Sequence, residues 1–200
     1  MFPLLIPYEN ERRPVAMRVL RNSETATRLL DPSEDNAAPY ELFFKELMVD
    51  PSVKQRLHEV FAMKDLRYPM GGGAESGGPE LLGRAAPDFT VRSSRGGTRL
   101  ALLQHSGRAT FVHGVNCDAE TQQVRRWRDR VDIIETQTAL PDGLAGMLIR
   151  PDGYIAWARN TQQACRSEEL KAALHTWFGS AVRTAGADRP DAADADPVAL

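Results

Sequence analysis

The sequence predicts an α/β domain preceded by a short helical segment. Two observations carry this prediction. Apolar residues recur at helical spacing in the first third of the 200-residue chain, whereas later apolar runs are short, rich in β-formers and separated by helical patterns. Between these parts, residues 69–79 are dense in glycine. We therefore predict a helical segment over residues 1–66, a glycine-rich linker over 67–83, the α/β domain over 84–181 and a disordered tail over 182–200.

Within the helical segment, residues 8–30 are predicted to form a helix, because Val15, Val19 and Leu29 recur among charged residues. Pro14 lacks an N–H group, so we expect either a kink or a new helix beginning near Arg13. Farther on, Asp50-Pro51 is a typical N-cap and first-turn pair for another helix. An apolar stripe precedes that pair (Tyr40, Phe43, Phe44, Leu47, Met48), and the new helix presents Val53, Leu57, Val60 and Phe61.

The α/β domain is predicted from strands and helices that alternate. Short strands are expected at 89–91, 110–115 and 133–138, and Gly96-Gly97 is expected to form a turn before 98–103. A helix presenting Ala119, Val124, Trp127 and Val131 should follow capping residues at 116–118. A hairpin at 147–158 turns at Pro151-Asp152-Gly153, and Ser167 caps a last helix. Strand, helix, strand, hairpin and helix is the order of a thioredoxin-like α/β domain.

Composition excludes several function classes. A net charge of -2 and an isoelectric point near 6.1 give no excess of cations for a phosphate backbone, so nucleic-acid binding is not expected. No apolar run approaches the roughly 20 residues that cross a bilayer, and the proline-broken start is not a signal peptide. Cys117 and Cys165 fit neither a disulfide framework nor a zinc site, so we expect a cytoplasmic protein without a metal.

Four sequence stretches resemble one family in order and approximate spacing. They are Tyr8-Glu-Asn-Glu-Arg-Arg-Pro-Val-Ala16, Gly83-Arg-Ala-Ala-Pro-Asp-Phe89, Thr98-Arg-Leu100 and Leu148-Ile-Arg-Pro-Asp-Gly-Tyr-Ile-Ala-Trp157. They resemble the C-terminal third of flavoprotein aromatic-ring hydroxylases, especially those acting on polyketides. The resemblance covers the chain to about Phe178, and the hairpin stretch is its most specific element. One departure is Ala158, where the family usually has arginine; here Arg159 comes one position later, which would put its charge on the other side of a strand.

The resemblance implies an FAD-dependent monooxygenase that uses NAD(P)H and O₂ to hydroxylate an electron-rich aromatic ring. In that family FAD is held by an N-terminal Rossmann-type region with a GxGxxG turn and by a later Gly-Asp motif, and this sequence has neither. We expect no FAD binding and no catalysis by this chain alone. The family's thioredoxin-like domain is generally structural and lacks a redox dithiol. The chain could be a gene remnant, an accessory subunit, or a domain that complements a separate flavin protein.

The resemblance also makes residues 1–30 the end of a long helix of the flavin and substrate domains. Alone, that helix lacks its packing partner. We therefore expect either a flavin-domain partner or self-association through the N-terminal helix.

The alternative function is thiol-redox chemistry at Cys117. This residue falls between a predicted strand and the start of a predicted helix, where thioredoxin-fold proteins carry a reactive cysteine. Against it, Asp118 and Glu120 place negative charge beside the sulfur, and neither a CxxC nor a Thr-x-x-Cys pattern is present. The plainer interpretation is a small, partly buried residue.

The other polar candidates are interpreted as structural or solvated. The histidines lack partners at metal-ligand spacing (His58, His105, His113, His175). Asp152 is expected to bond the backbone of its turn rather than act as an acid. Acidic residues interrupt the arginine cluster at 125–130, which favours a solvated face, and Trp127, Trp157 and Trp177 are expected to anchor a core or an interface.

Overall fold

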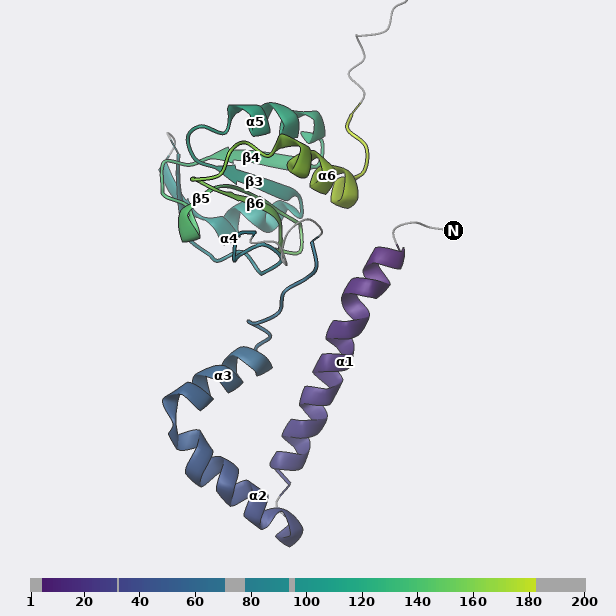
Figure 1. Ribbon diagram of the computed structural model, residues 1–200, viewed down its shortest axis with the longest axis vertical. Coiled ribbons are helices and arrows are strands. Elements are labelled where there is room, and N and C mark those ends of the chain that lie inside the picture. Colours follow the sequence, from purple (N-terminus) through teal and green to yellow (C-terminus); the bar gives the residue numbers. More distant parts are fainter. Residues whose placement is uncertain (1–4, 32, 71–77, 94–95, 183–200) are drawn as a thin grey trace, which may run out of the picture.

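The computed structural model describes residues 5–31, 33–70, 78–93 and 96–182. Figure 1 shows two parts, a set of helices that extends away and a compact part built on a sheet. We call residues 5–65 the helical region and residues 66–182 the α/β region. The glycines at 71–73 and 77 and the predicted tail from residue 183 lie outside the described residues.

The first helix, α1 (Leu5–Leu29), runs through Pro14 without interruption. A new helix near Arg13 was therefore a wrong prediction. Pro14 removes one backbone hydrogen bond, but the helix formers around it continue the pattern, and neighbouring side chains are held against the rest of the molecule. Arg18 Nη2, for example, lies 2.5 Å from Asp65 Oδ1.

The remaining helices of the helical region are short. Glu34–Asn36 form a 3₁₀ turn (η1), followed by α2 (Ala37–Glu41), a π-helical turn (η2, Leu42–Glu46), a second 3₁₀ turn (η3, Leu47–Val49) and α3 (Pro51–Phe61). The predicted start of α3 is confirmed: the Asp50 carboxylate accepts from Ser52 N at 2.7 Å, and Pro51 occupies the first turn. From α2 to α3 no residue is buried.

The α/β region is built on a four-stranded sheet in the order β4-β3-β5-β6. The strands are β3 (Ala109–His113), β4 (Val131–Glu135), β5 (Leu144–Ile149) and β6 (Ile155–Asn160). β3 and β4 are parallel and are joined through α5 (Asp118–Val124), whereas β5 is antiparallel to both β3 and β6. With α6 (Ser167–Phe178) at the end, this confirms the predicted α/β fold and its thioredoxin-like element order.

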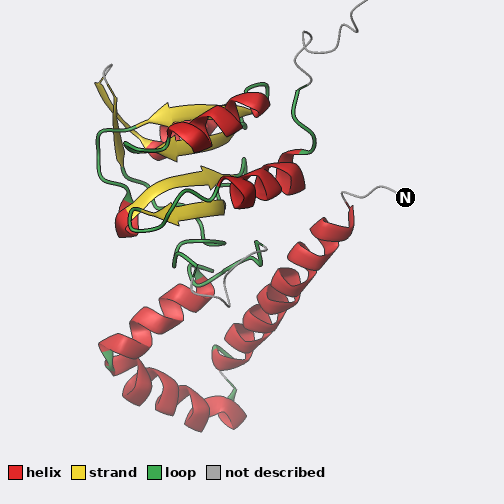
Figure 2. Cartoon of the chain, turned by 45° about the horizontal axis from the view of Figure 1, so that its top comes forward, coloured by secondary structure: helices red, strands yellow, loops and turns green. Residues whose placement is uncertain are grey.

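Both faces of the sheet are covered. Helices α5 and α6 lie over one face, where Phe111, Trp127, Leu148 and Leu174 form one buried cluster (Figures 1 and 2). On the other face, Val112, Met147 and Ile149 pack against the smaller hairpin and α4 in a second cluster. Because neighbouring strand residues point to opposite faces, Trp157 joins the first cluster and Ala158 the second.

The smaller hairpin corrects one prediction. β1 (Thr90–Ser93) pairs with β2 (Gly96–Arg99), so Gly96 and Gly97 belong to a strand rather than to the predicted turn. Of the residues 98–103 that follow, Thr98 and Arg99 end β2, and Leu100–Leu103 form a short helix (α4), followed by a 3₁₀ turn at Gln104–Ser106 (η4). Leu100 anchors this helix, since its side chain is 1% exposed.

Other local predictions were wrong at element ends. Val131 is the first residue of β4 rather than part of α5, because the helix tightens into a 3₁₀ turn at Arg125–Trp127 (η5). Ser167 is the first helical residue of α6, and Arg166 takes the N-cap position. At α5 the N-cap is Cys117, which lies within the predicted capping residues 116–118, but no side chain caps the helix. Strand β4 also begins and ends earlier than predicted, and residues 141–143 form a 3₁₀ turn (η6) before β5.

The flanks of the predicted linker are packed. Tyr68, Met70 and Leu82 belong to the first buried cluster, and Tyr68 N donates to Gly83 O at 2.8 Å. Gly83 has a φ of +81°, and a Cβ there would lie 2.2 Å from the Tyr68 carbonyl oxygen. Only glycine fits this close approach. Among the described residues, no helix is both long and apolar enough to cross a bilayer.

Candidate functional site

The loop from β3 into α5 carries Cys117, the residue to which the sequence assigns thiol chemistry. The thiol is 1% exposed and donates to Ala145 O at 3.3 Å. Behind it, the Arg159 guanidinium reaches from β6 and lies 3.2 Å from the sulfur. The shift of this arginine by one position therefore has a structural consequence, since it points to the face of the sheet covered by α5.

The charge of Arg159 is already neutralised. Its Nε lies 2.7 Å from Glu120 Oε1, and the two side chains are 6% and 1% exposed. Its remaining nitrogens donate to the carbonyl oxygens of Asn116 and Gln163 at 3.2 and 3.1 Å. This buried ion pair was not predicted. The one signal for it is an arginine that follows the apolar run Ile155-Ala-Trp-Ala.

The environment of Cys117 opposes an activated thiolate. Burial is the largest influence and raises the pKa of the thiol above its ordinary value; the Arg159 charge acts in the opposite direction, and Glu120 adds to the rise. A reactive cysteine needs a lowered pKa and an accessible sulfur. The structure therefore does not support the thiol-redox alternative, and Cys117 is a small buried residue at the N-cap of α5.

A polar hollow of about 390 Å³ lies beside this loop and is lined by His113, Thr121, Arg125 and Glu135 among others. His113 Nδ1 donates to Gly114 O at 2.9 Å, so its Nε2 is the acceptor for the Thr121 hydroxyl at 3.3 Å. Both ring nitrogens are thus engaged. Within the described residues, no group of three His, Cys, Asp or Glu side chains could hold a metal ion.

The residues around this hollow do not fit a flavin dinucleotide. A pyrophosphate needs a glycine-rich turn at the N-terminus of a helix. The hollow is instead lined by the carboxylates of Asp118 and Glu135, whose charges repel phosphate, and the loop before α5 does not match GxGxxG.

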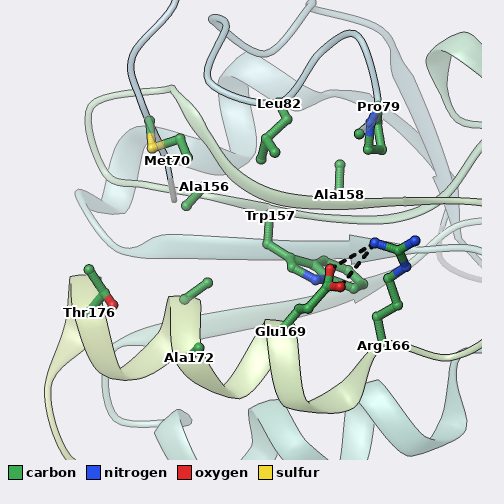
Figure 3. Close-up of a pocket in the computed structure, with 12 residues that line it drawn as sticks. Met70, Pro79, Leu82, Ala156, Trp157, Ala158, Arg166, Glu169, Ala172 and Thr176 are labelled. Atoms are coloured by element: carbon green, nitrogen blue, oxygen red, sulfur yellow. Dashed lines mark hydrogen bonds and ion pairs between the residues drawn. The ribbon is translucent and has the colours of Figure 1, made fainter. Parts of the chain in front are cut away.

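A second cavity, of about 230 Å³, lies between β6, α6 and the segment before Gly83 (Figure 3). Its walls are mostly apolar, with Met70, Leu82 and Trp157, and the Arg166–Glu169 ion pair stands at its edge at 2.9 Å. The volume is below the roughly 300 Å³ at which ligand pockets begin. It is a gap between packed elements rather than a site for a large aromatic substrate.

The other predicted positions are structural in the described residues. His175 meets the Trp127 ring edge-on at 5.1 Å, and His58 lies beside an apolar groove of the helical region. Asp152 accepts weakly from Tyr154 N at 3.5 Å, as expected for its turn, but its main partners are the side chains of Arg150 and Arg12. These two contacts were not foreseen.

A model of the family described as "Aromatic-ring hydroxylase, C-terminal" matches residues 79–181, which is more than half of the chain. The chain belongs to this family. Relatives of this chain are monooxygenases, and monooxygenases of this family are generally flavin-dependent.

The curated relatives are full-length enzymes. The chain is 36% identical over 182 residues to "12-dehydrotetracycline 5-monooxygenase/anhydrotetracycline 6-monooxygenase" of Streptomyces rimosus, covering 88% of the chain and 34% of that protein. It is also 36% identical over 182 residues to the rifampicin monooxygenase of Rhodococcus hoagii, covering 90% and 33%. The chain thus spans about a third of the length of these relatives.

Solved structures agree in fold. The anhydrotetracycline hydroxylase OxyS from Streptomyces rimosus matches with a TM-score of 0.77 at 34% identity, over 90% of this chain and 36% of that one. CabE, an aromatic hydroxylase from angucycline biosynthesis, matches with a TM-score of 0.72 at 32% identity, over 88% and 35%. Because each match covers about nine-tenths of this chain, the helical region as well as the α/β region follows the family pattern.

Proposed function

We propose that this chain is the C-terminal portion of an FAD-dependent aromatic hydroxylase of the polyketide type, with a structural or accessory role and no catalysis of its own. FAD and NAD(P)H would be bound by a flavin and substrate body on which the helical region rests. The polar hollow at α5 does not fit a dinucleotide, which supports a non-catalytic role for the chain.

One observation carries the proposal: the helical region has no hydrophobic core of its own. Among the described residues, every buried hydrophobic side chain lies at or after Leu66. Large hydrophobic side chains before that point stay exposed, such as Leu20 at 64% and Leu30 at 61%. Others in the same region are Met17, Val19, Tyr40, Leu42, Leu47, Val49 and Phe61. A surface of this kind is typical of a protein interface.

An apolar groove continues this surface. It has a volume of about 330 Å³ between the end of α1, η2 and α3, and it is lined by Leu29, Phe43, Phe44 and Phe61 among others. The chain matches about a third of the length of its relatives, and a body like the rest of those proteins would supply a partner for this groove. A flavin-domain partner is therefore the occupant we propose, and self-association is what the isolated chain does without it.

The test is sedimentation of the whole chain, alone and mixed with a flavin and substrate body made from the first two-thirds of the anhydrotetracycline monooxygenase. We expect concentration-dependent self-association of the chain alone and a mixed complex when the body is added. Leu20→Glu should abolish both. Leu102→Glu is the matched control, because Leu102 is similarly exposed at 58% but lies in the α/β region.

Two results would overturn the proposal. If the chain stays monomeric at every concentration and does not bind the flavin body, its helical region is not an interface. Retention of FAD by the isolated chain after gel filtration, seen as flavin absorbance, would show that it carries a cofactor site of its own.

A further inference from the structure

Arg150 lies at the point where three elements meet. It follows β5, in the turn of the β5–β6 hairpin, and its side chain is 8% exposed. Its Nη1 and Nη2 lie 2.6 and 3.1 Å from the two carboxylate oxygens of Glu11 on α1, and Glu11 is 9% exposed. Such a two-bond pairing fixes direction as well as distance. The two partners are 139 residues apart in the sequence.

The same guanidinium is held from other sides. Its Nε donates to Asp152 Oδ1 at 3.1 Å, and its Nη2 also bonds that carboxylate. Its carbon lies 4.3 Å from the centre of the Trp177 ring on α6 and 5.7 Å from the Tyr68 ring. The position of the guanidinium is thus set by the α/β region, and only Glu11 among these partners belongs to α1.

A second arginine extends the contact along α1. Arg12 Nη2 lies 2.9 Å from Asp152 Oδ2, and its Nη1 donates to the Tyr68 hydroxyl at 3.1 Å. Opposite charges therefore face each other across the contact: Glu11 pairs with Arg150, and Arg12 pairs with Asp152. This pairing favours one rotation of α1 about its axis, because turning the helix by one residue would replace the Glu11 carboxylate with the amide of Asn10 or the cation of Arg12.

Three of the four stretches that carry the family resemblance meet at this turn. Glu11 and Arg12 belong to the first stretch, and Arg150 and Asp152 to the last. The second stretch lies against the same hairpin, where Gly83 N donates to Ile155 O and Ala86 N donates to Gly153 O, each at 2.9 Å. These stretches, with the hairpin stretch as the most specific of them, therefore surround a joint between the two regions rather than a pocket.

We infer that Arg150 is a positioning residue: it sets the direction and rotation in which α1 leaves the α/β region, and so the placement of the hydroxylase body that rests on α1. The inference rests on the proposed function for the role of that body. The α/β region then acts as an alignment element. Its contribution to hydroxylation is the geometry of the helical region, with no group of its own at the reacting atoms.

The test measures the distance between α1 and the α/β region in the whole chain. Spin labels on the exposed native Cys165 and on Ser23→Cys report this distance, while Cys117 is buried and should stay unlabelled. We expect a narrow distance distribution in the parent and a broad one in Arg150→Met and in Glu11→Gln. Backbone hydrogen exchange at residues 15–20 of α1 should become about tenfold faster in Arg150→Met. The substitution leaves the buried Glu11 carboxylate unpaired, which favours local opening of α1.

Arg108→Met is the matched control. Arg108 also pairs with a carboxylate, Asp132 at 2.8 Å, but within the α/β region and away from α1. It should leave the label distance unchanged. Arg150→Lys should restore part of the narrow distribution, since lysine keeps the charge but cannot form the two-bond pairing with Glu11.

Glu11→Gln protects the test against misfolding, because it leaves every contact inside the α/β region in place. If the distances stay narrow in both Arg150→Met and Glu11→Gln, other contacts of α1 hold it and the inference is wrong. The proposed function is tested separately. If it is wrong, the flavin body does not bind, but the label distances still broaden in the two variants.

Discussion

The helical region and the α/β region differ in what their side chains contact. In the α/β region, strands and helices enclose two clusters of buried residues, and the Arg159–Glu120 pair is closed off from solvent. In the helical region, ion pairs such as Arg28–Glu24 are exposed at 79% and 63%, and large hydrophobic side chains such as Leu20 are exposed. The α/β region is therefore stabilised by its own buried core, whereas the helical region depends on the contact at Arg150 and on its proposed partner.

The largest expected effect comes from breaking a buried ion pair. Arg159→Met leaves Glu120 charged and unpaired in the interior, which should cost about 3–5 kcal/mol of the free energy of unfolding. The matched change Arg28→Met breaks an exposed pair on α1 and should cost less than about 0.5 kcal/mol. Urea unfolding followed by tryptophan fluorescence measures both. Equal losses for the two variants would contradict the contrast between the regions.

Deleting the same side chain in each region sharpens the comparison. Leu148 is 0% exposed at the centre of the sheet, so Leu148→Ala should cost about 2–5 kcal/mol through lost burial and a cavity. Leu47 in the helical region is 46% exposed, and Leu47→Ala should stay within about 0.5 kcal/mol. Thermal unfolding of the two variants measures the difference. A large loss at Leu47 in the isolated chain would show that this surface is already covered, for example by self-association.

Much of the fold could be predicted because periodicity reports burial. The strands at 110–115 and 147–158 and the Pro151-Asp152-Gly153 turn carry strong local signals, and they appear where they were expected. The errors fall at element ends, where a 3₁₀ turn or a neighbouring strand decides. Val131 has an apolar side chain that suits a helix face or a strand equally, and pairing with Ala109 places it in β4.

The candidate site could be predicted less well because its decisive contacts are distant in sequence. The position of Cys117 before α5 was foreseen, but the Arg159 and Glu120 charges that meet behind it depend on how β6 packs on α5. The Glu11–Arg150 contact joins two stretches that were each recognised as family signals. No periodicity or local motif indicates that two such stretches touch.

The smallest expected effect concerns Cys117 and tests whether the α/β region keeps any redox chemistry of its own. In a Cys165→Ala variant only one thiol reports. We expect slow alkylation whose rate rises only at a pH above the ordinary cysteine pKa of about 8.5, because the thiolate is the reactive form and burial raises the pKa of this thiol. Denaturant should accelerate the reaction by exposing the sulfur.

The raised pKa also makes the free energy of unfolding depend on pH. The protonated thiol favours the folded state below the unfolded pKa of about 8.5, and this gain is lost as the pH rises through the folded pKa. The parent should therefore lose stability as the pH rises above the unfolded pKa of about 8.5, relative to Cys117→Ala, in which the titrating group is absent. Fast alkylation with a pKa below about 7 would mean that the N-terminus of α5 and Arg159 outweigh burial, and the α/β region would then be more than an alignment element.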